Sequence, residues 1–356
     1  MIPSPLERYD IEPWNPLCSQ DSKICLLLIR TLIEEYTKSG GAEISWSRST
    51  LSYGKGILKL NYIFITIGYS QVVNLGKAGL KEISAVLKKN SDSILKTNVV
   101  GSDFSFFKYG KTNLVFKIEP MIFYKSLTIQ ENALLSVLVP INDFSTSGTW
   151  PSIAMIDFEK PVDVGEEFFD YVDAVFQNLR DRRIKVASGH TGSYGNLGYG
   201  VAGTMALVGF KRPIFSFKRI KEDDSYYSVG KLGAELSFFK HKKEGSKADS
   251  PLDLSIEKYV KEFIKIRSIV HYIHDISEGG LMRALGEVSA LVRSGFNVSS
   301  QDVENVAAKG TEEYGARVFS ASSSGALIVA VDSKRKKEFE KVIKSKSWPI
   351  LEIKKR

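Results

Sequence analysis

Apolar residues recur at spacings of three and four in several stretches of the chain, and they alternate or run together in others. The first pattern is typical of helices with one buried face, and the second of strands. The helical pattern covers residues 24–36, 80–87, 165–180, 255–267, 279–293 and 333–344, and residues 131–139 are expected to form a helical turn that leads into a buried segment. Strands are predicted at 57–67, 113–118, 184–187, 204–208, 269–273, 316–320 and 326–331. Because strands and helices alternate, we expect an α/β (α+β) protein.

The character of the sequence changes after Phe210. Lys211-Arg212-Pro213 and the charged stretch 218–224 are typical of a crossover between domains. A chain of 356 residues has room for two domains. We therefore predict one domain at 1–212 and a second at 213–356, with a long polar loop at 241–252.

The composition excludes a disordered chain and a membrane-spanning one. Hydrophobic residues make up 43% of the sequence, and no apolar run approaches the roughly 20 residues that a membrane span needs. The first residues show no basic segment followed by an apolar one, so we expect no signal peptide. Cys18 and Cys25 have no zinc-motif spacing and are too few for a disulfide framework. We expect a cytoplasmic protein with no membrane partner.

The positive charge is concentrated in the second half of the chain. The charges of residues 1–210 cancel, so the net charge of +8 lies on residues 211–356. Residues 333–356 hold ten Lys and Arg against three Glu. Such a face could meet a polyanion, or it could be the solvated surface of a helix whose apolar residues face the core. The second interpretation is favoured because no aromatic stacking platform accompanies the charge, and we do not expect a nucleic-acid partner.

Several familiar motifs are absent or unconvincing. No phosphate-binding G-x-x-x-x-G-K-[ST] loop, H-E-x-x-H or G-x-S-x-G occurs. Residues 198–203 fit G-x-G-x-x-G, but a strand is predicted directly after them, where a dinucleotide-binding motif requires a helix. A flexible Gly-rich loop from Gly189 to Gly203, between two strands, fits better. His271 and His274 would point to opposite faces of a strand, which disfavours a shared metal.

The segment from Ile273 to Leu281 carries more information. An apolar strand ends in His274-Asp275, and then Ser277, an acidic residue and Gly279-Gly280 open a helix. Glycines at a helix start leave backbone N–H groups exposed, and the helix dipole favours an anion there. The alternative is a tight strand-to-helix turn in which Asp275 or Ser277 only caps the helix. The residues alone leave both open.

Carboxylates also follow apolar segments in the first half of the chain. Asp103 lies in a Gly-Ser-Asp-Phe turn, Glu119 follows the strand predicted at 113–118, and Asn142-Asp143 follow an apolar run. Taken singly, each is typical of a capping or surface residue. Gathered near a Gly-rich loop, they suit Mg²⁺ that bridges nucleotide phosphates.

In this order, these segments resemble the aminoimidazole ribonucleotide (AIR) synthetase-related, PurM-like superfamily. Residues 274–287, His-Asp-Ile-Ser-Glu-Gly-Gly-Leu-Met-Arg-Ala-Leu-Gly-Glu, are similar to its H-D-[IV]-S-[DE]-G-G-L-x-x-A-L-x-E motif. Residues 319–327 resemble its F-S-E-S-x-G-R segment, and residues 139–151 resemble V-N-D-[IL]-x-A-M-G-A-x-P. Residues 188–191 resemble G-G-[DH]-T, and residues 101–104 resemble G-D-D-A.

The resemblance implies a two-domain fold with ATP and Mg²⁺ as cofactors. The N-terminal α/β domain would pair with that of a second copy into a dimeric β-barrel, and the C-terminal domain would be an α/β sandwich. The implied Mg²⁺ ligands are Asp103, Glu119 and Asp143. The residues implied to hold nucleotide, phosphate or substrate are Gly189, His190, Thr191, Asn142, Asp275, Gly279 and Gly280.

The chain departs from the family motifs at three acidic positions. Ser102 replaces the first Asp of G-D-D, Glu119 replaces an Asp, and His190 replaces the Asp of G-G-D-T. His190 points to the AIR synthase-related branch, and residues 1–99 match no family segment. The resemblance implies an ATP-dependent kinase or synthetase (ligase-like) that phosphorylates or activates an amide or oxygen of a small-molecule or protein substrate. The alternative is a nucleotide-binding scaffold without chemistry, or a maturation factor like HypE.

Overall fold

The computed structural model describes residues 51–53, 56–58, 88–89, 95–97, 102–161, 164–192, 201–246 and 250–356. The chain divides into two compact units, Met1–Lys77 and Ala78–Arg356. In the first unit the described residues form a two-stranded antiparallel ribbon of β1 (Leu51–Tyr53) and β2 (Gly56–Leu58). The predicted helices at 24–36 and 80–87 and most of the strand predicted at 57–67 lie outside the described residues.

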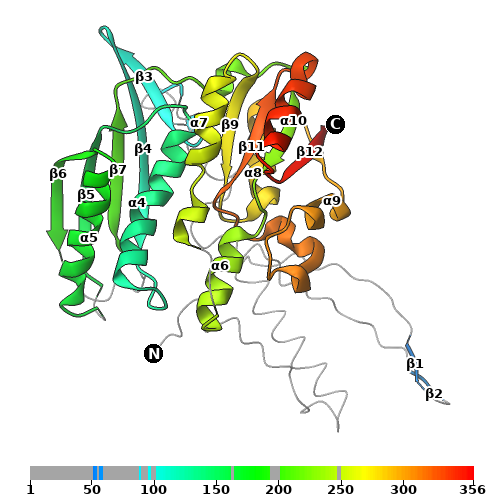
Figure 1. Ribbon diagram of the computed structural model, residues 1–356, viewed down its shortest axis with the longest axis horizontal. Helices are drawn as coiled ribbons and strands as arrows, with labels where there is room; N and C mark the ends of the chain where they lie inside the picture. The colour runs from blue at the N-terminus through cyan, green and yellow to red at the C-terminus, as the bar shows by residue number, and fades with distance from the viewer. Residues whose placement is uncertain are drawn as a thin grey trace. The chain divides into compact units, whose positions relative to one another are not determined.

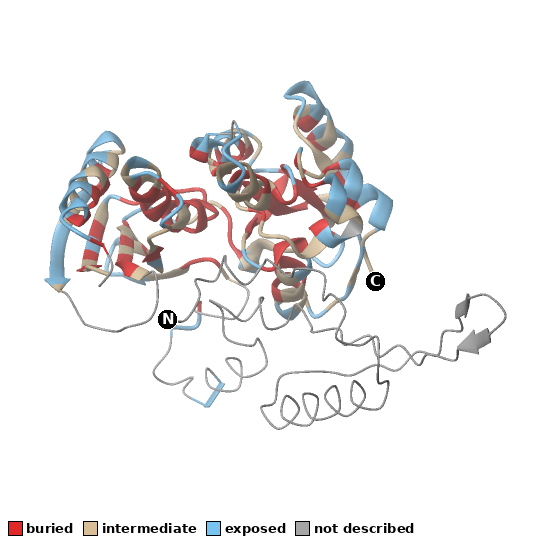
Figure 2. Cartoon of the chain, turned by 90° about the horizontal axis from the view of Figure 1, so that it is seen from below, coloured by how far each residue is buried: buried red, intermediate tan, exposed pale blue. Residues whose placement is uncertain are grey.

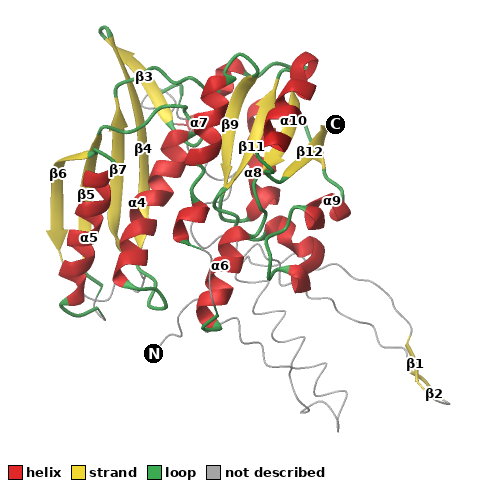
Figure 3. Cartoon of the chain, in the orientation of Figure 1, coloured by secondary structure: helices red, strands yellow, loops and turns green. Residues whose placement is uncertain are grey.

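The second unit contains two five-stranded sheets with helices packed on them (Figures 1 and 3). The first sheet has the order β3-β4-β7-β5-β6 and is antiparallel except for the pair β5 and β6. Its strands are β3 (Ser105–Tyr109), β4 (Thr112–Ile122), β5 (Ile153–Glu159), β6 (Lys185–Gly192) and β7 (Val201–Gly209). Its helices are α4 (Ile129–Ser145) and α5 (Glu167–Asp181), which cover one face.

The second sheet has the order β10-β12-β8-β11-β9 and is antiparallel. Its strands are β8 (Ser225–Val229), β9 (Val270–Ile276), β10 (Phe296–Asn297), β11 (Ala326–Val331) and β12 (Ile350–Lys355). The α-helices are α6 (Ala234–Lys243), α7 (Glu257–Lys265), α8 (Gly280–Val292), α9 (Ser300–Asn305) and α10 (Lys336–Ser345). The 3-10 helices are η3 (Phe217–Arg219), η4 (Pro251–Leu254), η5 (Glu312–Ser320) and η6 (Ser333–Arg335).

Alternation along the strands explains both cores. In β5 the residues Ala154, Ile156 and Phe158 are buried under the helices, while Met155 between them is exposed. The central strand β11 is buried along its whole length, because α7 and α10 pack on one face of the second sheet and α8 packs on the other. Among the described residues the two sheets therefore differ: the second is covered on both faces, and the first on one.

Helix α4 contacts both halves of the unit. A capping box of Thr128 and Glu131 fixes its start. Nearly every residue from Asn132 to Ser145 is buried, because α4 packs on its own sheet and also contacts η4, α7 and β9 (Figure 2). The helix runs through Pro140, so the predicted helical turn at 131–139 continues further than expected. Burial on several sides outweighs the proline's preference to end a helix.

Some predicted elements are confirmed and others are wrong. The strands predicted at 113–118, 204–208, 269–273 and 326–331 and the helices at 165–180, 255–267, 279–293 and 333–344 are present with shifted ends. The strand predicted at 316–320 is wrong, because η5 lies there with a kink at Gly315. The loop predicted to begin at Gly189 is also wrong at both ends, since β6 continues to Gly192 and β7 begins at Val201. Residues 241–243 belong to α6 and not to a polar loop.

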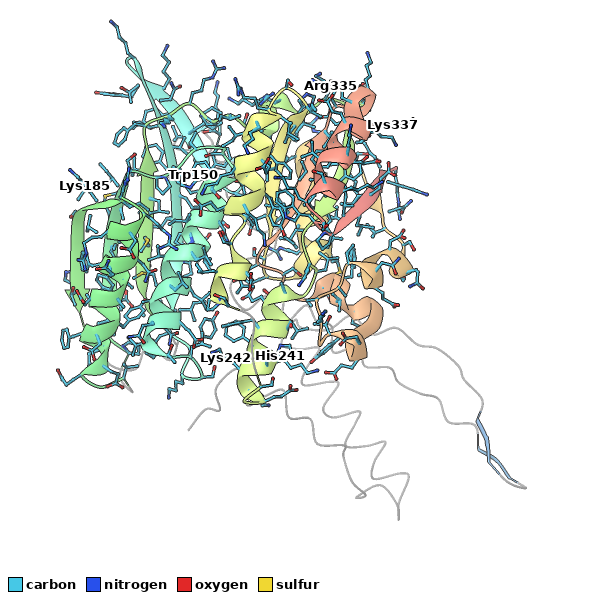
Figure 4. All side chains as sticks on the ribbon, viewed as in Figure 1. Trp150, Lys185, His241, Lys242, Arg335 and Lys337 are labelled. Atoms are coloured by element: carbon cyan, nitrogen blue, oxygen red, sulfur yellow. The ribbon has the colours of Figure 1, made fainter. Side chains whose placement is uncertain are left out.

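The basic C-terminal segment includes α10, whose apolar face is buried. Phe339 and Ile343 pack in the core of the second sheet, and Arg335 and Lys337 lie on the outer side (Figure 4). Several of its cations pair with nearby glutamates, including Arg335 with Glu338. This arrangement agrees with the solvated helix surface favoured from the sequence. Within the described residues, none of the helices is long and apolar enough to cross a membrane.

Candidate functional site

Asp103 and the His274-Asp275 pair converge although 171 and 172 positions separate them in sequence. Asp103 lies just before β3, and β9 ends two residues after His274. The Asp103 carboxylate lies 2.7 Å from His274 Nδ1 and accepts a hydrogen bond of 3.1 Å from the Asp275 backbone N–H. All three residues are buried. The contact therefore joins the segment before the first sheet to the second sheet.

The imidazole of His274 lies between two carboxylates. Its Nδ1 faces Asp103, and its Nε2 lies 3.0 Å from Glu287 Oε2. An imidazole donates from both nitrogens only when it is protonated. Burial by itself lowers the pKa of His274, but the charge of Asp103 and the hydrogen bonds to Asp103 and Glu287 outweigh it, so the pKa lies well above its usual value. His274 is therefore an imidazolium that holds Asp103, and it has no lone pair to offer a metal.

Helix α8 supplies the second carboxylate to this cluster. Glu287 lies two turns into α8 on the face that packs on the sheet, together with Leu281, Ala284 and Val288. The Arg283 guanidinium, one turn earlier, donates to Glu287 at 3.2 Å. Arg283 and His274 thus neutralise Glu287 from two sides, so that a carboxylate can be buried in this core.

The backbone at the start of α8 favours glycine at two successive positions. Gly279 and Gly280 both have positive φ, at 77° and 60°, which L side chains rarely adopt. A Cβ on Gly280 would lie 2.5 Å from the carbonyl oxygen of Ala321. The N-cap residue is Gly279, which carries no side chain that could cap the helix. The capping role that the sequence leaves open for Asp275 or Ser277 stays a prediction.

Within the described residues, one group of side chains has the spacing of a metal site. Single ligand atoms of Asp103, His274 and Asp275 lie within 4.8 Å of one another. Both ring nitrogens of His274 already face carboxylates, those of Asp103 and Glu287, so the two carboxylates of Asp103 and Asp275 remain as candidate ligands. Mg²⁺ is commonly held by one or two carboxylates together with phosphate oxygens and water. Asp103 and Asp275 therefore fit a nucleotide-bound divalent cation, with His274 as an orienting neighbour.

Glu119 and Asp143, the other two predicted magnesium ligands, lie around Lys117. Lys117 Nζ lies 2.6 Å from Glu119 Oε1 and also forms an ion pair with Asp143 Oδ2. Side chains of Asp103, Glu119 and Asp143 do not all come within 4.8 Å of one another. The three predicted ligands therefore divide between two clusters, and their metal roles stay predictions.

Asn142 connects the two halves of the unit. Its Nδ2 donates to the carbonyl of Leu254 at 2.8 Å, and its Oδ1 accepts from the N–H of Ile256 at 3.2 Å. The side chain is 5% exposed, so both ends of the amide are used inside the protein. The structure gives Asn142 a role between α4 and the start of α7, and its nucleotide contact stays a prediction.

Gly189, His190 and Thr191 lie within the edge strand β6, near its C-terminal end at Gly192. His190 pairs with Asp157 of β5, and all three residues are exposed. They line a hollow of about 330 Å³ between β6 and α5, together with apolar side chains such as Phe158 and Phe176. The structure does not show these residues in the Asp103 cluster, and their phosphate contact stays a prediction.

A larger groove of about 620 Å³ lies beside β3. It is lined by Phe106, Phe107 and the cations Lys96, Lys108, Lys111, Arg212 and Lys218. Lys218 lies over the Phe106 ring, with 5.3 Å between Nζ and the ring centroid. The groove is basic, and the carboxylate cluster does not line it.

The sequence analysis did not assign Lys117, Arg283 or Glu287 to the site. Lys117 lies in the strand predicted at 113–118 and Glu119 directly follows it, and a strand that continues through position 119 places both residues on one face. That alternation was the signal for their ion pair. Glu287 is seven residues after Gly280 in a predicted helix, which places it about two turns along α8, but its pairing with His274 depends on how the helix packs.

The comparisons with known proteins agree with this geometry. Residues 229–353 match the AIR synthase related protein, C-terminal domain. AaThiL complexed with AMPPCP and TMP is 16% identical with a TM-score of 0.57, over 78% of this chain and 92% of that one. The thiamine monophosphate kinase of Aquifex aeolicus is 15% identical with a TM-score of 0.56, over 78% and 95%. The hydrogenase maturation protein HypE in complex with ATP is 17% identical with a TM-score of 0.54, over 79% and 88%.

Residues 229–353 form an AIR synthase-related C-terminal domain. The resemblance to AIR synthase-related proteins and the mixed α/β fold with two sheets are thereby confirmed. No curated protein sequence matches the chain. The branch of the chain within the superfamily and its pairing into a dimeric β-barrel stay predictions.

Proposed function

We propose that the chain binds ATP with a divalent cation at Asp103 and Asp275 and uses it to phosphorylate or activate an oxygen of a small-molecule acceptor. The observation that carries the proposal is the convergence of Asp103 with the His274-Asp275 end of β9. The solved relatives support the nucleotide class, because one is complexed with AMPPCP and another with ATP. A cation bound there would neutralise phosphate charge, which is the main contribution a protein makes to phosphoryl transfer.

The chain's own residues prepare this site before any ligand arrives. His274 holds one oxygen of Asp103, and the Asp275 N–H holds the other. Glu287 and Arg283 fix the imidazolium from the opposite side. Through the turn at Gly279-Gly280, α8 begins only five residues after Asp275 in the sequence. The helix dipole favours phosphate at that N-terminus. The Asp103 carboxylate is therefore held in place before a ligand binds.

A second copy of the chain is the proposed partner, through the face of the first sheet that α4 and α5 do not cover. The register places Ile118, Ala206 and Met155 in one row across β4, β7 and β5. Ile118 is 64% exposed and Met155 is 41% exposed. Phe116 and Val208 form the neighbouring row. An apolar sheet face of this kind favours association, and sedimentation should show a species of about twice the 39.7 kDa chain mass.

A catalytically inactive nucleotide-binding scaffold is the second candidate. It is favoured by Lys117, whose ammonium already neutralises the Glu119–Asp143 pair that the family resemblance implies for Mg²⁺. Ser102 and His190 point the same way, since each replaces an acid of the family motifs. A scaffold binds nucleotide without turning it over, so activity separates the two candidates.

The test is ADP release from Mg-ATP in the presence of a panel of small-molecule acceptors. The wild-type chain should release ADP with at least one acceptor, and Asp275→Asn should slow that release by about tenfold or more, as changes around metal sites commonly do. Asp302→Asn, at an exposed position of α9, is the matched control and should not change the rate. Nucleotide binding with no acceptor-dependent release favours the scaffold, and equal rates in wild type and Asp275→Asn contradict the site.

A further inference from the structure

A lysine lies among apolar side chains between the first sheet and α4. In β4, Lys117 and Glu119 alternate with outward residues and share a face with Val115 and Met121, which are fully buried. Their partners across β7 are Leu207 and Met205, which are also fully buried. Lys117 thus points from the strand toward the helix, and its stem is held by the core.

Two carboxylates meet the end of that side chain. Glu119 reaches back along its own strand to within 2.6 Å of Lys117 Nζ, and Asp143 comes from α4. The side chains of Lys117 and Asp143 are 14% and 10% exposed. Both ion pairs are thus largely shielded from water, and the two carboxylates hold the Lys117 ammonium between them.

The replacement of the family's Asp by Glu at position 119 fits this arrangement. Residues two apart on a strand have Cα atoms about 6.6–6.8 Å apart. A glutamate has one methylene more than an aspartate, so its carboxylate reaches the ammonium of Lys117 on the same face. The departure at Glu119 and the presence of Lys117 are thus parts of one ion-pair network.

We propose that Lys117 is a built-in cation that takes the place of a divalent metal ion between Glu119 and Asp143. A metal ion bound by both carboxylates would lie about 2.0–2.6 Å from an oxygen of each. The Lys117 ammonium already occupies that position between the same two oxygens. Because the stem of Lys117 is fixed in the core, the ammonium and a metal ion exclude one another. Divalent cations then bind this chain at Asp103 and Asp275 and not at the Glu119–Asp143 pair.

The test counts bound Mn²⁺ by electron paramagnetic resonance on the full-length chain, without nucleotide. Lys117→Met keeps the length of the stem and removes the charge, so it should bind one Mn²⁺ per chain more than wild type. Lys117→Met combined with Glu119→Gln should lose that additional ion. Lys111→Met removes an exposed charge in the turn between β3 and β4 and should bind the same number as wild type. A folded Lys117→Met protein with no additional Mn²⁺ overturns the proposal.

A second arm keeps Lys117 in place, because Lys117→Met leaves two buried carboxylates without their cation and could fail to fold. Glu119→Gln and Asp143→Asn, each in the wild-type background, should leave the number of bound Mn²⁺ unchanged. Loss of one ion in either variant overturns the proposal. The titration contains no nucleotide, so its outcome is independent of the proposed ATP-dependent function. Loss of an ion in Asp275→Asn reports only on the Asp103–Asp275 site.

Discussion

Replacing Asn142 by alanine should destabilise the unit formed by residues 78–356. The Asn142 side chain lies at the end of α4 and bonds to the backbone on either side of Ser255. Alanine removes both bonds and leaves the carbonyl of Leu254 and the N–H of Ile256 without this partner. Leu254 and Ile256 are themselves buried, so water does not readily replace the lost amide.

The magnitude follows from the two backbone groups. Each buried polar group that loses its partner costs about 1–3 kcal/mol, so the free energy of unfolding should fall by about 2–6 kcal/mol. For a domain of 150–250 residues, each kcal/mol lowers the melting temperature by about 2–4 °C. We therefore expect a loss of about 4–24 °C, together with faster hydrogen exchange at the Ile256 amide.

The assay is thermal unfolding followed by circular dichroism, without nucleotide. Asn305→Ala, at an exposed position of α9, is the control and should melt within about 1 °C of wild type. A melting temperature for Asn142→Ala within about 2 °C of wild type would refute the structural role. If nucleotide affinity fell in such a variant, Asn142 would be the nucleotide contact that the family resemblance implies.

Two further predictions concern the glycine turn at the start of α8 and the buried side chain of His274. Gly280→Ala should lower the free energy of unfolding by more than about 2 kcal/mol, because the new Cβ would lie 2.5 Å from a backbone oxygen. Gly245→Ala has a similar φ of 64° but no atom within 4 Å of the new Cβ, so it should lower that free energy by only about 1 kcal/mol. Urea unfolding of both variants checks the difference. The raised pKa of His274 stabilises the fold fully below its unfolded value of about 6.5, and this contribution is lost as pH rises toward the folded pKa. The free energy of unfolding should therefore fall above pH 6.5 by up to about 1.4 kcal/mol per pH unit, and His274→Gln should remove that slope; an unchanged slope contradicts the assignment.

Local patterns in the sequence were sufficient for the elements with strong periodicity. The spacing of apolar residues in 165–180 and 279–293 predicted α5 and α8 within a few residues, because each presents one continuous buried face. The apolar run at 326–331 predicted β11, which is buried on both faces. In these segments the pattern of buried positions is regular along the whole element, so the local sequence is sufficient to predict it.

Segments whose structure depends on distant packing were not predictable in this way. Residues 316–320 have the composition of a short strand, yet Val318 is buried in the core of the second sheet as part of η5. Residues 131–139 were expected to form only a helical turn, but α4 continues through Pro140 because it is buried against both halves of the unit. The glycines from Gly189 to Gly192 suggested a loop, although β6 pairs with β5 through them.

The candidate site was predictable in its motif and not in its geometry. His274-Asp275 and Gly279-Gly280 were recognised from sequence, since each lies at a strand end or helix start. The pairing of His274 with Asp103 spans 171 positions, about half of the chain, and only the tertiary fold brings the two residues together. The sequence interpretation considered only the acidic residues of this region and missed Lys117, whose charge changes what Glu119 and Asp143 can bind.

The central claim is that Asp103 and Asp275 hold the cation of a bound nucleotide. Isothermal titration calorimetry with AMPPCP, in the presence and absence of Mg²⁺, tests it most directly. Wild type should bind AMPPCP with Mg²⁺ at least about tenfold more tightly than without it, and Asp275→Asn should lose that difference. An affinity of wild type for AMPPCP that does not depend on Mg²⁺, or a Mg²⁺ dependence that persists in Asp275→Asn, would contradict the account.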